Sequence, residues 1–211
     1  MQIHDITRPL HTTTAPWPGD TPFEHHLTWK IADGAAVNVG ALSMGTHNGT
    51  HADAPFHYLP GGTTIDALDP ALFLGPAVVA DVTNAGWSIG LDALADAARH
   101  FQNGAVPRLL LKTGAWPDST RFPDRLPLLA PDVPAFLGAA GVRLLGLDVP
   151  SVDAIDSKDL PIHHALADAN ICIMESLDLS AVPAGVYELI ALPLRITGGD
   201  ASPVRAVLRK S

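Results

Sequence analysis

Short apolar runs separated by turn residues recur along the chain, and this pattern predicts more strands than helices. Several runs are apolar on both faces, so helices are expected to cover part of the sheet that they form. The fold class expected is therefore α/β or α+β with a central sheet. Strands are predicted at residues 37–44, 77–82, 109–112, 142–147, 186–192 and 203–208.

Helical periodicity is confined to three segments. It predicts helices at residues 91–100, with Ser88 as the N-terminal cap, at 132–140, ended by Gly141, and at 163–169. No repeat or linker divides the chain, and 211 residues suit one good-sized domain. Residues 1–211 are therefore expected to fold as a single domain.

Composition and charge exclude several classes of protein. Hydrophobic residues make up 47% and charged residues 17%, so the chain can form a substantial core. The formal net charge of -9, with 13 scattered Lys and Arg residues, argues against nucleic acid as a partner. One cysteine, Cys172, cannot form an internal disulfide and is expected to be a buried thiol in an apolar run.

The N-terminal residues lack the features of a signal peptide. The most apolar stretch, at residues 71–80, is interrupted by Gly75-Pro76 and is too short to span a bilayer. A cytoplasmic protein without a membrane partner is therefore expected.

One segment carries four side chains of the metal-ligand type in eleven residues. It reads His47-Asn48-Gly49-Thr50-His51-Ala52-Asp53-Ala54-Pro55-Phe56-His57. Glycine, threonine and proline disfavour a helix here, and in an extended chain all four ligand-type side chains would share one face. Imidazole and carboxylate groups suit zinc, and Asp53 has two oxygens with which it could bridge two metals. Chance clustering of ordinary histidines explains this spacing poorly.

A second metal would need ligands from elsewhere in the chain. The best candidates are the pair His163-His164 and Glu175, which lies in an apolar run where an unpaired carboxylate would be costly to bury. An alternative is that Glu175 sits on an edge strand and faces water. The remaining histidines show no such grouping and are expected to be ordinary: His4, His11, His25, His26 and His100.

These residues resemble a known family. The pattern H-x-G-T-H-x-D-x-P-x-H resembles the signature of the metal-dependent cyclase-like hydrolases, and among them the chain is most similar to the bacterial kynurenine formamidases (arylformamidases). The similarity extends to segments 17–20, 111–114, 146–153, 187–194 and 200–208. It implies a β-barrel-like sheet with flanking helices, of the swivelling β/β/α type, and a homodimer or higher homo-oligomer.

The resemblance also implies roles for particular residues. His47, His51 and Asp53 would hold a first zinc, and Asp53, a histidine and Glu175 a second. The family's spacing of twelve residues before the glutamate selects His163, although the adjacent His164 stays open. His57 would transfer protons, and Trp17 would line the pocket for an aryl ring. The implied reaction is hydrolysis of N-formyl-L-kynurenine to L-kynurenine and formate in tryptophan degradation.

Other functions stay open at this stage. A relative in the same family could open a cyclic amide such as isatin, or cleave another small amide or ester. The metal could be manganese or cobalt, because these ligands accept both. A non-catalytic metal-binding module would leave His57 without a purpose. Finally, Gly86-Trp87-Ser88-Ile89-Gly90 fits the G-x-S-x-G elbow of serine hydrolases, although no apolar strand leads directly into it.

Overall fold

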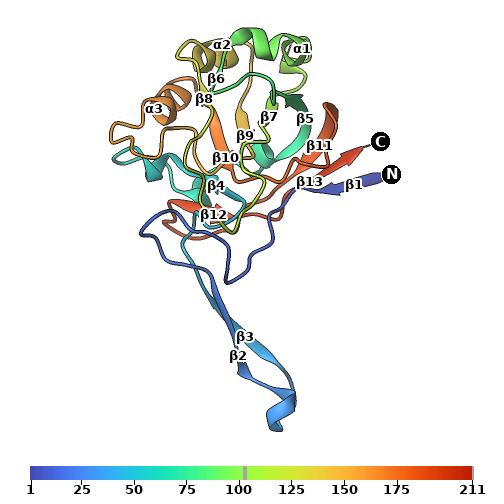
Figure 1. Cartoon of the computed structure of the whole chain (residues 1–211), viewed down its shortest axis with the longest axis vertical. Coiled ribbons are helices and arrows are strands. Elements are labelled where there is room, and N and C mark those ends of the chain that lie inside the picture. The colour runs from blue at the N-terminus through green and yellow to red at the C-terminus, as the bar shows by residue number, and fades with distance from the viewer. Residues whose placement is uncertain (102–103, 211) are drawn as a thin grey trace.

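A computed structural model describes residues 1–101 and 104–210, and within them nine strands form one curled sheet, shown in Figure 1. Their order is β1-β13-β11-β5-β7-β9-β10-β4-β12. The strands are β1 (Gln2–Asp5), β4 (His51–Asp53), β5 (Leu74–Asp81), β7 (Arg108–Lys112), β9 (Leu144–Leu147), β10 (Cys172–Glu175), β11 (Gly185–Ile190), β12 (Ala201–Pro203) and β13 (Val207–Lys210). The four strands from β5 to β10 are parallel, and the flanking strands are antiparallel.

Helices cover one face of this sheet (Figure 1). They are α1 (Ala95–Ala98), α2 (Val133–Ala139) and α3 (Pro161–Asp168). Side chains alternate along the strands, so Leu109 and Leu111 pack in the cluster under the helices, while Leu110 packs in a second cluster on the other face. Both faces are thus buried, and the predicted α/β class with a barrel-like sheet is confirmed. Among the described residues, no helix is long and apolar enough to cross a membrane.

Most of the strands predicted from the hydrophobic pattern are present, but the last one was wrong. Residues 203–208 do not form one strand: they span the end of β12 and the start of β13. β12 lies at one end of the strand order, whereas β13 lies between β1 and β11 near the other end. The chain must therefore cross between distant strands of the curled sheet, and this crossing interrupts the strand that alternation predicted.

The predicted helix at residues 91–100 was also only partly right. A 3-10 turn (Leu91–Leu94) precedes the single turn of α1. Ser88 does not cap it, because Ser88 lies in β6 (Ser88–Ile89), which pairs with β8 (Leu128–Leu129), and Gly90 occupies the cap position. A serine inside a strand is also not at the sharp strand-to-helix turn that a nucleophile elbow requires.

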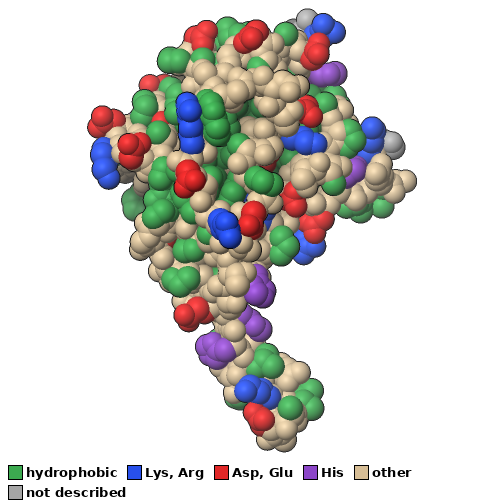
Figure 2. All heavy atoms as spheres, in the orientation of Figure 1, with side chains coloured by type: hydrophobic (Ala, Val, Ile, Leu, Met, Phe, Trp, Pro, Cys, Tyr) green, Lys and Arg blue, Asp and Glu red, His purple; other side chains and the backbone are tan. Residues whose placement is uncertain are grey.

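A two-stranded hairpin projects from the body of the molecule (Figure 1). It consists of β2 (Glu24–Trp29) and β3 (Val39–Ser43), which pair with each other and with no other strand of the described residues. Every residue of β2 is exposed, and Figure 2 shows apolar side chains gathered towards the end of the hairpin. We call residues 21–45 the arm. Its two ends lead directly to the segments of Trp17 and His47.

Candidate metal centre

Two of the predicted ligands lie on β4, a short buried strand between β10 and β12. Because His51 and Asp53 are two positions apart in an extended strand, their side chains share a face. The Nε2 atom of His51 is 3.2 Å from Oδ1 of Asp53, and both side chains are almost wholly buried. For this pair, the extended geometry expected from the sequence is present.

His47 and His57 lie outside the strand that carries His51 and Asp53, so the shared face of an extended chain does not apply to them. His47 lies in a turn before β4, where Gly49 has a positive φ of 66°. His57 ends a 3-10 turn (Pro55–His57) that begins at a proline. These two turns nevertheless bring the imidazole rings together, with centroids 4.0 Å apart. Nδ1 of His47 lies 3.2 Å from Oδ1 of Asp53.

Glu175 ends β10 and is paired in register with His51 on β4. Its Oε2 atom lies 3.5 Å from Nε2 of His51. Its side chain is 5% exposed, so the alternative of a solvent-facing edge glutamate is wrong. The backbone N–H of Val152 donates to Oε1 of Glu175 at 3.0 Å and helps to fix the carboxylate.

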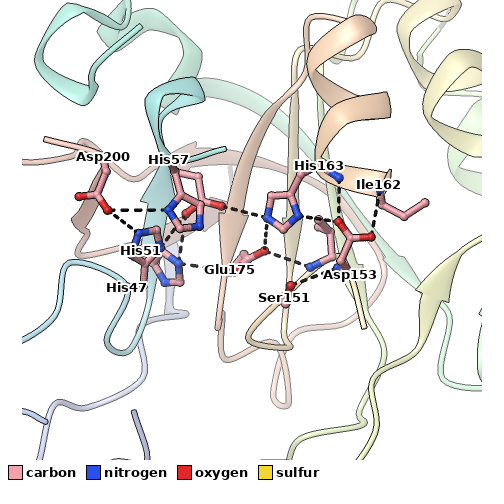
Figure 3. Close-up of polar contacts among 11 residues, drawn as sticks. His47, His51, His57, Ser151, Asp153, Ile162, His163, Glu175 and Asp200 are labelled. Atoms are coloured by element: carbon pink, nitrogen blue, oxygen red, sulfur yellow. Dashed lines mark hydrogen bonds and ion pairs between the residues drawn. The ribbon is translucent and has the colours of Figure 1, made fainter. Parts of the chain in front are cut away.

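His163 comes from the first turn of α3 and points at the same two carboxylates. Its Nε2 atom is 3.8 Å from Oδ2 of Asp53 and 3.8 Å from Oε1 of Glu175, as Figure 3 shows. His164 lies instead near the ring of Tyr58, and it belongs to none of the ligand groups found among the described residues. The geometry thus places His163, rather than His164, beside Glu175.

Two further carboxylates, for which the sequence suggested no role, hold the histidines in place (Figure 3). Asp153 accepts a hydrogen bond from Nδ1 of His163 at 2.7 Å and caps α3 by accepting from the backbone N–H groups of Ile162 and His163. Asp200 lies 3.0 Å from Nε2 of His47 and 3.8 Å from Nδ1 of His57. Such carboxylate–histidine pairs commonly fix the tautomer and orientation of a metal-binding imidazole.

The ionisable groups of the centre shift one another's pKa values strongly. Burial opposes the protonated form of His51, but the adjacent carboxylates of Asp53 and Glu175 raise the pKa of His51 to about 10. Burial also acts to raise the pKa of Asp53, yet His163, His47 and His51 hold it well below its usual range. Burial and the nearby charge of Asp53 raise the pKa of Glu175. The two carboxylates therefore favour positive charge beside them, whether on an imidazole or on a bound cation.

The same residues fit a metal. Within the described part of the chain, His51 Nε2 and both carboxylate oxygens of Asp53 are buried without a hydrogen-bond partner. Buried polar atoms are normally satisfied, so these three orphaned atoms need a cation between them. Three groups of ligand atoms lie within coordinating reach of one another. One is His47, His57 and Asp200, and the other two are His47, His51 and Asp53, and Asp53, His163 and Glu175. The last two groups share Asp53, whose two oxygens can serve two ions.

The centre opens into a cavity of about 450 Å³. His47, His57, His163 and Glu175 line it together with an aromatic wall. Trp17 and Phe122 form part of this wall, with their rings 5.1 Å apart in an edge-to-face arrangement. Ser88 does not line it. A metal centre that opens into a cavity with an aromatic wall suits a bound small molecule rather than a purely structural role.

Comparison with known proteins agrees with this geometry. Residues 4–154 match the family described as "Putative cyclase". The chain belongs to this family. It is 47% identical over 205 residues to a kynurenine formamidase of Bacillus mycoides (strain KBAB4). The aligned residues make up 97% of this chain and 96% of the relative.

Solved structures resemble the whole chain. One, of a potential metal-dependent hydrolase with cyclase activity, has a TM-score of 0.82 at 26% identity and covers 100% of this chain and 99% of the other. Isatin hydrolase A from Labrenzia aggregata has a TM-score of 0.78 at 25% identity and covers 98% of this chain and 93% of the other. The likeness is therefore that of the complete fold and not of one motif.

The turn that carries His57 depends on Gly62. A Cβ atom at Gly62 would lie 2.5 Å from the carbonyl carbon of Pro55, whereas one at Gly61 would meet nothing within 4 Å. We expect Gly62→Ala to lower the free energy of unfolding by about 1–3 kcal/mol, because backbone must move. Gly61→Ala, which only strains a positive φ, should cost about 1 kcal/mol. Urea unfolding measures both, and a smaller loss for Gly62→Ala than for Gly61→Ala would contradict this view.

Proposed function

We propose that this chain hydrolyses N-formyl-L-kynurenine to L-kynurenine and formate, with two zinc ions, as a step of tryptophan degradation. The observation that carries the proposal is a pair of His and carboxylate groups sharing Asp53, at one end of a cavity with an aromatic wall. The identity of 47% to a kynurenine formamidase over almost the whole chain supports the choice of substrate.

His47, His51 and Asp53 would hold one ion, and Asp53, His163 and Glu175 the other. When bound, the ions supply Lewis-acid activation of the formyl carbonyl and of the attacking water. Asp153 keeps Nδ1 of His163 engaged, so that Nε2 is directed at Asp53 and Glu175. Asp200 holds the ring of His47 in a similar way. It contacts Nε2 of His47, so that Nδ1 is directed at Asp53.

His57 is suited to moving a proton. Its side chain is 34% exposed and lines the cavity, so a substrate can reach it. Burial lowers the pKa of His57, which favours the neutral ring that can accept a proton. In the proposed reaction, His57 takes a proton from the water and returns one to the departing aryl nitrogen, which is a poor leaving group until it is protonated. Asp200, 3.8 Å from Nδ1, helps to orient the ring.

Trp17 and Phe122 provide apolar surface for the aryl ring. Aromatic side chains pair with ligand rings in offset or edge-to-face arrangements, and the edge-to-face contact between these two holds the indole in place. A cyclic amide such as isatin is a second candidate substrate, because an isatin hydrolase has the same fold. Both substrates present an amide attached to an aromatic ring, so the metal centre and the aromatic wall alone favour neither.

Turnover and metal content test the proposal together. We expect the purified protein to release formate from N-formyl-L-kynurenine, to lose this activity with a chelator and to regain it with zinc. Manganese and cobalt should be compared with zinc, because the ligands accept all three. Faster opening of isatin than cleavage of N-formyl-L-kynurenine would favour the second candidate, and full activity after complete metal removal would exclude both metal-dependent reactions.

The metal content of variants should distinguish the proposed acid–base role of His57 from the ligand role of His51, Asp53 and His163. A general acid–base residue can be removed while the metals stay, whereas loss of a ligand weakens metal binding. We expect His57→Ala to keep near-normal metal content and thermal stability but to lose about 10²–10⁴ in kcat. Asp53→Ala should lose both ions, and His163→Ala mainly one. A His57→Ala protein that arrives with one metal missing would show that His57 is a ligand.

We also propose that the chain forms a homodimer through the arm. An isolated two-stranded hairpin is at best marginally stable in water, and this one makes its strand contacts only with itself. Six large apolar side chains of the arm are exposed by 36% to 65%: Leu27, Trp29, Ile31, Val37, Val39 and Leu42. At roughly 150 Å² or more for each large side chain, every arm offers on the order of 500 Å² of apolar surface.

The exposed apolar surface of the arm is large enough to bind a second copy of the chain. In a two-fold dimer, each arm lies on the partner and both are covered by the same interface. The two arms and the surfaces beneath them would then bury about 2,000 Å², which is enough for a stable dimer. Because the arm leads directly to the segments of Trp17 and His47, such contacts would also steady one side of the cavity.

The oligomeric state tests this. We expect a dimer by sedimentation at micromolar concentration, and a monomer for Trp29→Asp combined with Leu42→Asp, because charge on the arm opposes its burial. Trp87→Asp serves as the control, since Trp87 is similarly exposed at 49% but lies on the body. A monomeric wild-type protein, or a double variant that remains dimeric, would contradict the proposal.

A further inference from the structure

The cavity contains two opposite charges that the chemistry above does not use. Lys158 and Asp20 both line it, and they come from segments far apart in the chain. Lys158 belongs to the loop between β9 and α3, and Asp20 closes the loop that carries Trp17. Within residues 1–101 and 104–210, neither side chain takes part in an ion pair within 4.0 Å. Each charge is therefore available to a ligand.

The surroundings of Lys158 and Asp20 also leave both charges free to contact a ligand. Lys158 is exposed, and although Asp156 and Asp159 lie close to it in sequence, no ion pair within 4.0 Å joins them in the described structure. Asp20 is half-buried, and its Oδ1 atom accepts a hydrogen bond from the backbone N–H of Thr21 at 2.6 Å, which fixes the carboxylate at the base of the arm. The cavity thus presents one cation and one anchored anion beside its aromatic wall.

We infer that Lys158 binds the α-carboxylate, and Asp20 the α-ammonium, of an amino-acid substrate. This inference rests on the proposed function, because N-formyl-L-kynurenine carries both groups at the end of its side chain, away from the formamide. A simple formanilide has neither group and would leave both charges without a partner. The cavity, at about 450 Å³, is in the range that encloses a ligand larger than one ring. The pair makes the site selective for zwitterionic aryl formamides.

Three substrates separate the two contacts. They are N-formyl-L-kynurenine, its decarboxylated analogue N-formylkynurenamine, and the analogue that lacks only the amino group. Lys158→Met should lower kcat/KM for N-formyl-L-kynurenine by about 10- to 100-fold relative to the decarboxylated analogue, mainly through KM, because a hydrogen bond to a charged group is lost. Lys158→Arg should restore most of the preference.

Asp20→Asn should act in the complementary way. It keeps an oxygen that can accept from Thr21, so the loop is preserved, but it removes the charge that would attract the ammonium. We expect kcat/KM for N-formyl-L-kynurenine to fall relative to the analogue without the amino group. Lys210→Met is the matched control, because Lys210 lies on β13 over the ring of Tyr187 and outside the cavity. Its selectivity should equal that of the wild-type protein.

The outcomes distinguish this inference from the function on which it rests. If the metal-loaded wild-type protein cleaves the three substrates equally well, or if Lys158→Met slows all three by the same factor, the charge pair has no role in selectivity while the formamidase function stands. If the wild-type protein cleaves none of them, the proposed function fails and this inference fails with it. Direct binding of L-kynurenine, measured by calorimetry, should weaken in Lys158→Met to the same extent as KM rises.

Discussion

Two buried carboxylates within reach of the same histidines impose the main constraint on this molecule. Asp53 and Glu175 are both removed from water, and each makes the negative charge of the other harder to bury. Three imidazoles converge on them, and still His51 Nε2 and both oxygens of Asp53 lack hydrogen bonds among the described residues. A bound cation resolves this, which is why the geometry points to a metal site rather than to an ordinary salt-bridge network.

The fold meets this constraint with rigid elements. The register between β4 and β10 sets His51 opposite Glu175, and the alternation of the strand places Asp53 on the same face as His51. The start of α3 adds His163, and Asp153 fixes both the helix end and the imidazole. A single carboxylate thus couples secondary structure to the orientation of a ligand. Hydrogen bonds of this kind to metal-binding histidines commonly determine which ring nitrogen is free for the metal.

Turns and loops surround the cavity and carry the side chains proposed to act on the substrate. His57 is carried by a short turn, Trp17 by a loop, and Lys158 by the connection before α3. The arm begins just after the Trp17 loop and ends just before the turn that carries His47. Functional side chains on loops held by a rigid scaffold are common in enzymes, because loops can vary while the scaffold keeps the chemistry in place. In this family, such variation is where we expect differences between formamide and cyclic amide substrates.

Elements with a local signal could be predicted from the amino-acid sequence alone. Apolar alternation identified the central strands, and the density of ligand-type residues in 47–57 identified the segment that forms the centre. It also named His163 and Glu175 as candidates, but the choice between His163 and His164 rested on a resemblance, and their contact with Asp53 depends on pairing across more than a hundred residues. Asp200 gave no signal, because an isolated aspartate in a polar segment is ordinary until its neighbours are known.

Features that depend on distant segments could not be predicted from the sequence and became visible in the folded chain. The strand predicted at 203–208 divides because the chain crosses the curled sheet there, and Ser88 pairs in β6 rather than capping a helix. His47 and His57 reach the centre through turns and not through strand alternation. Local propensity limits the secondary structures that a segment can form. Long-range pairing and burial decide which of these structures has the lowest free energy in the folded chain. The positions of the charged groups follow from that structure.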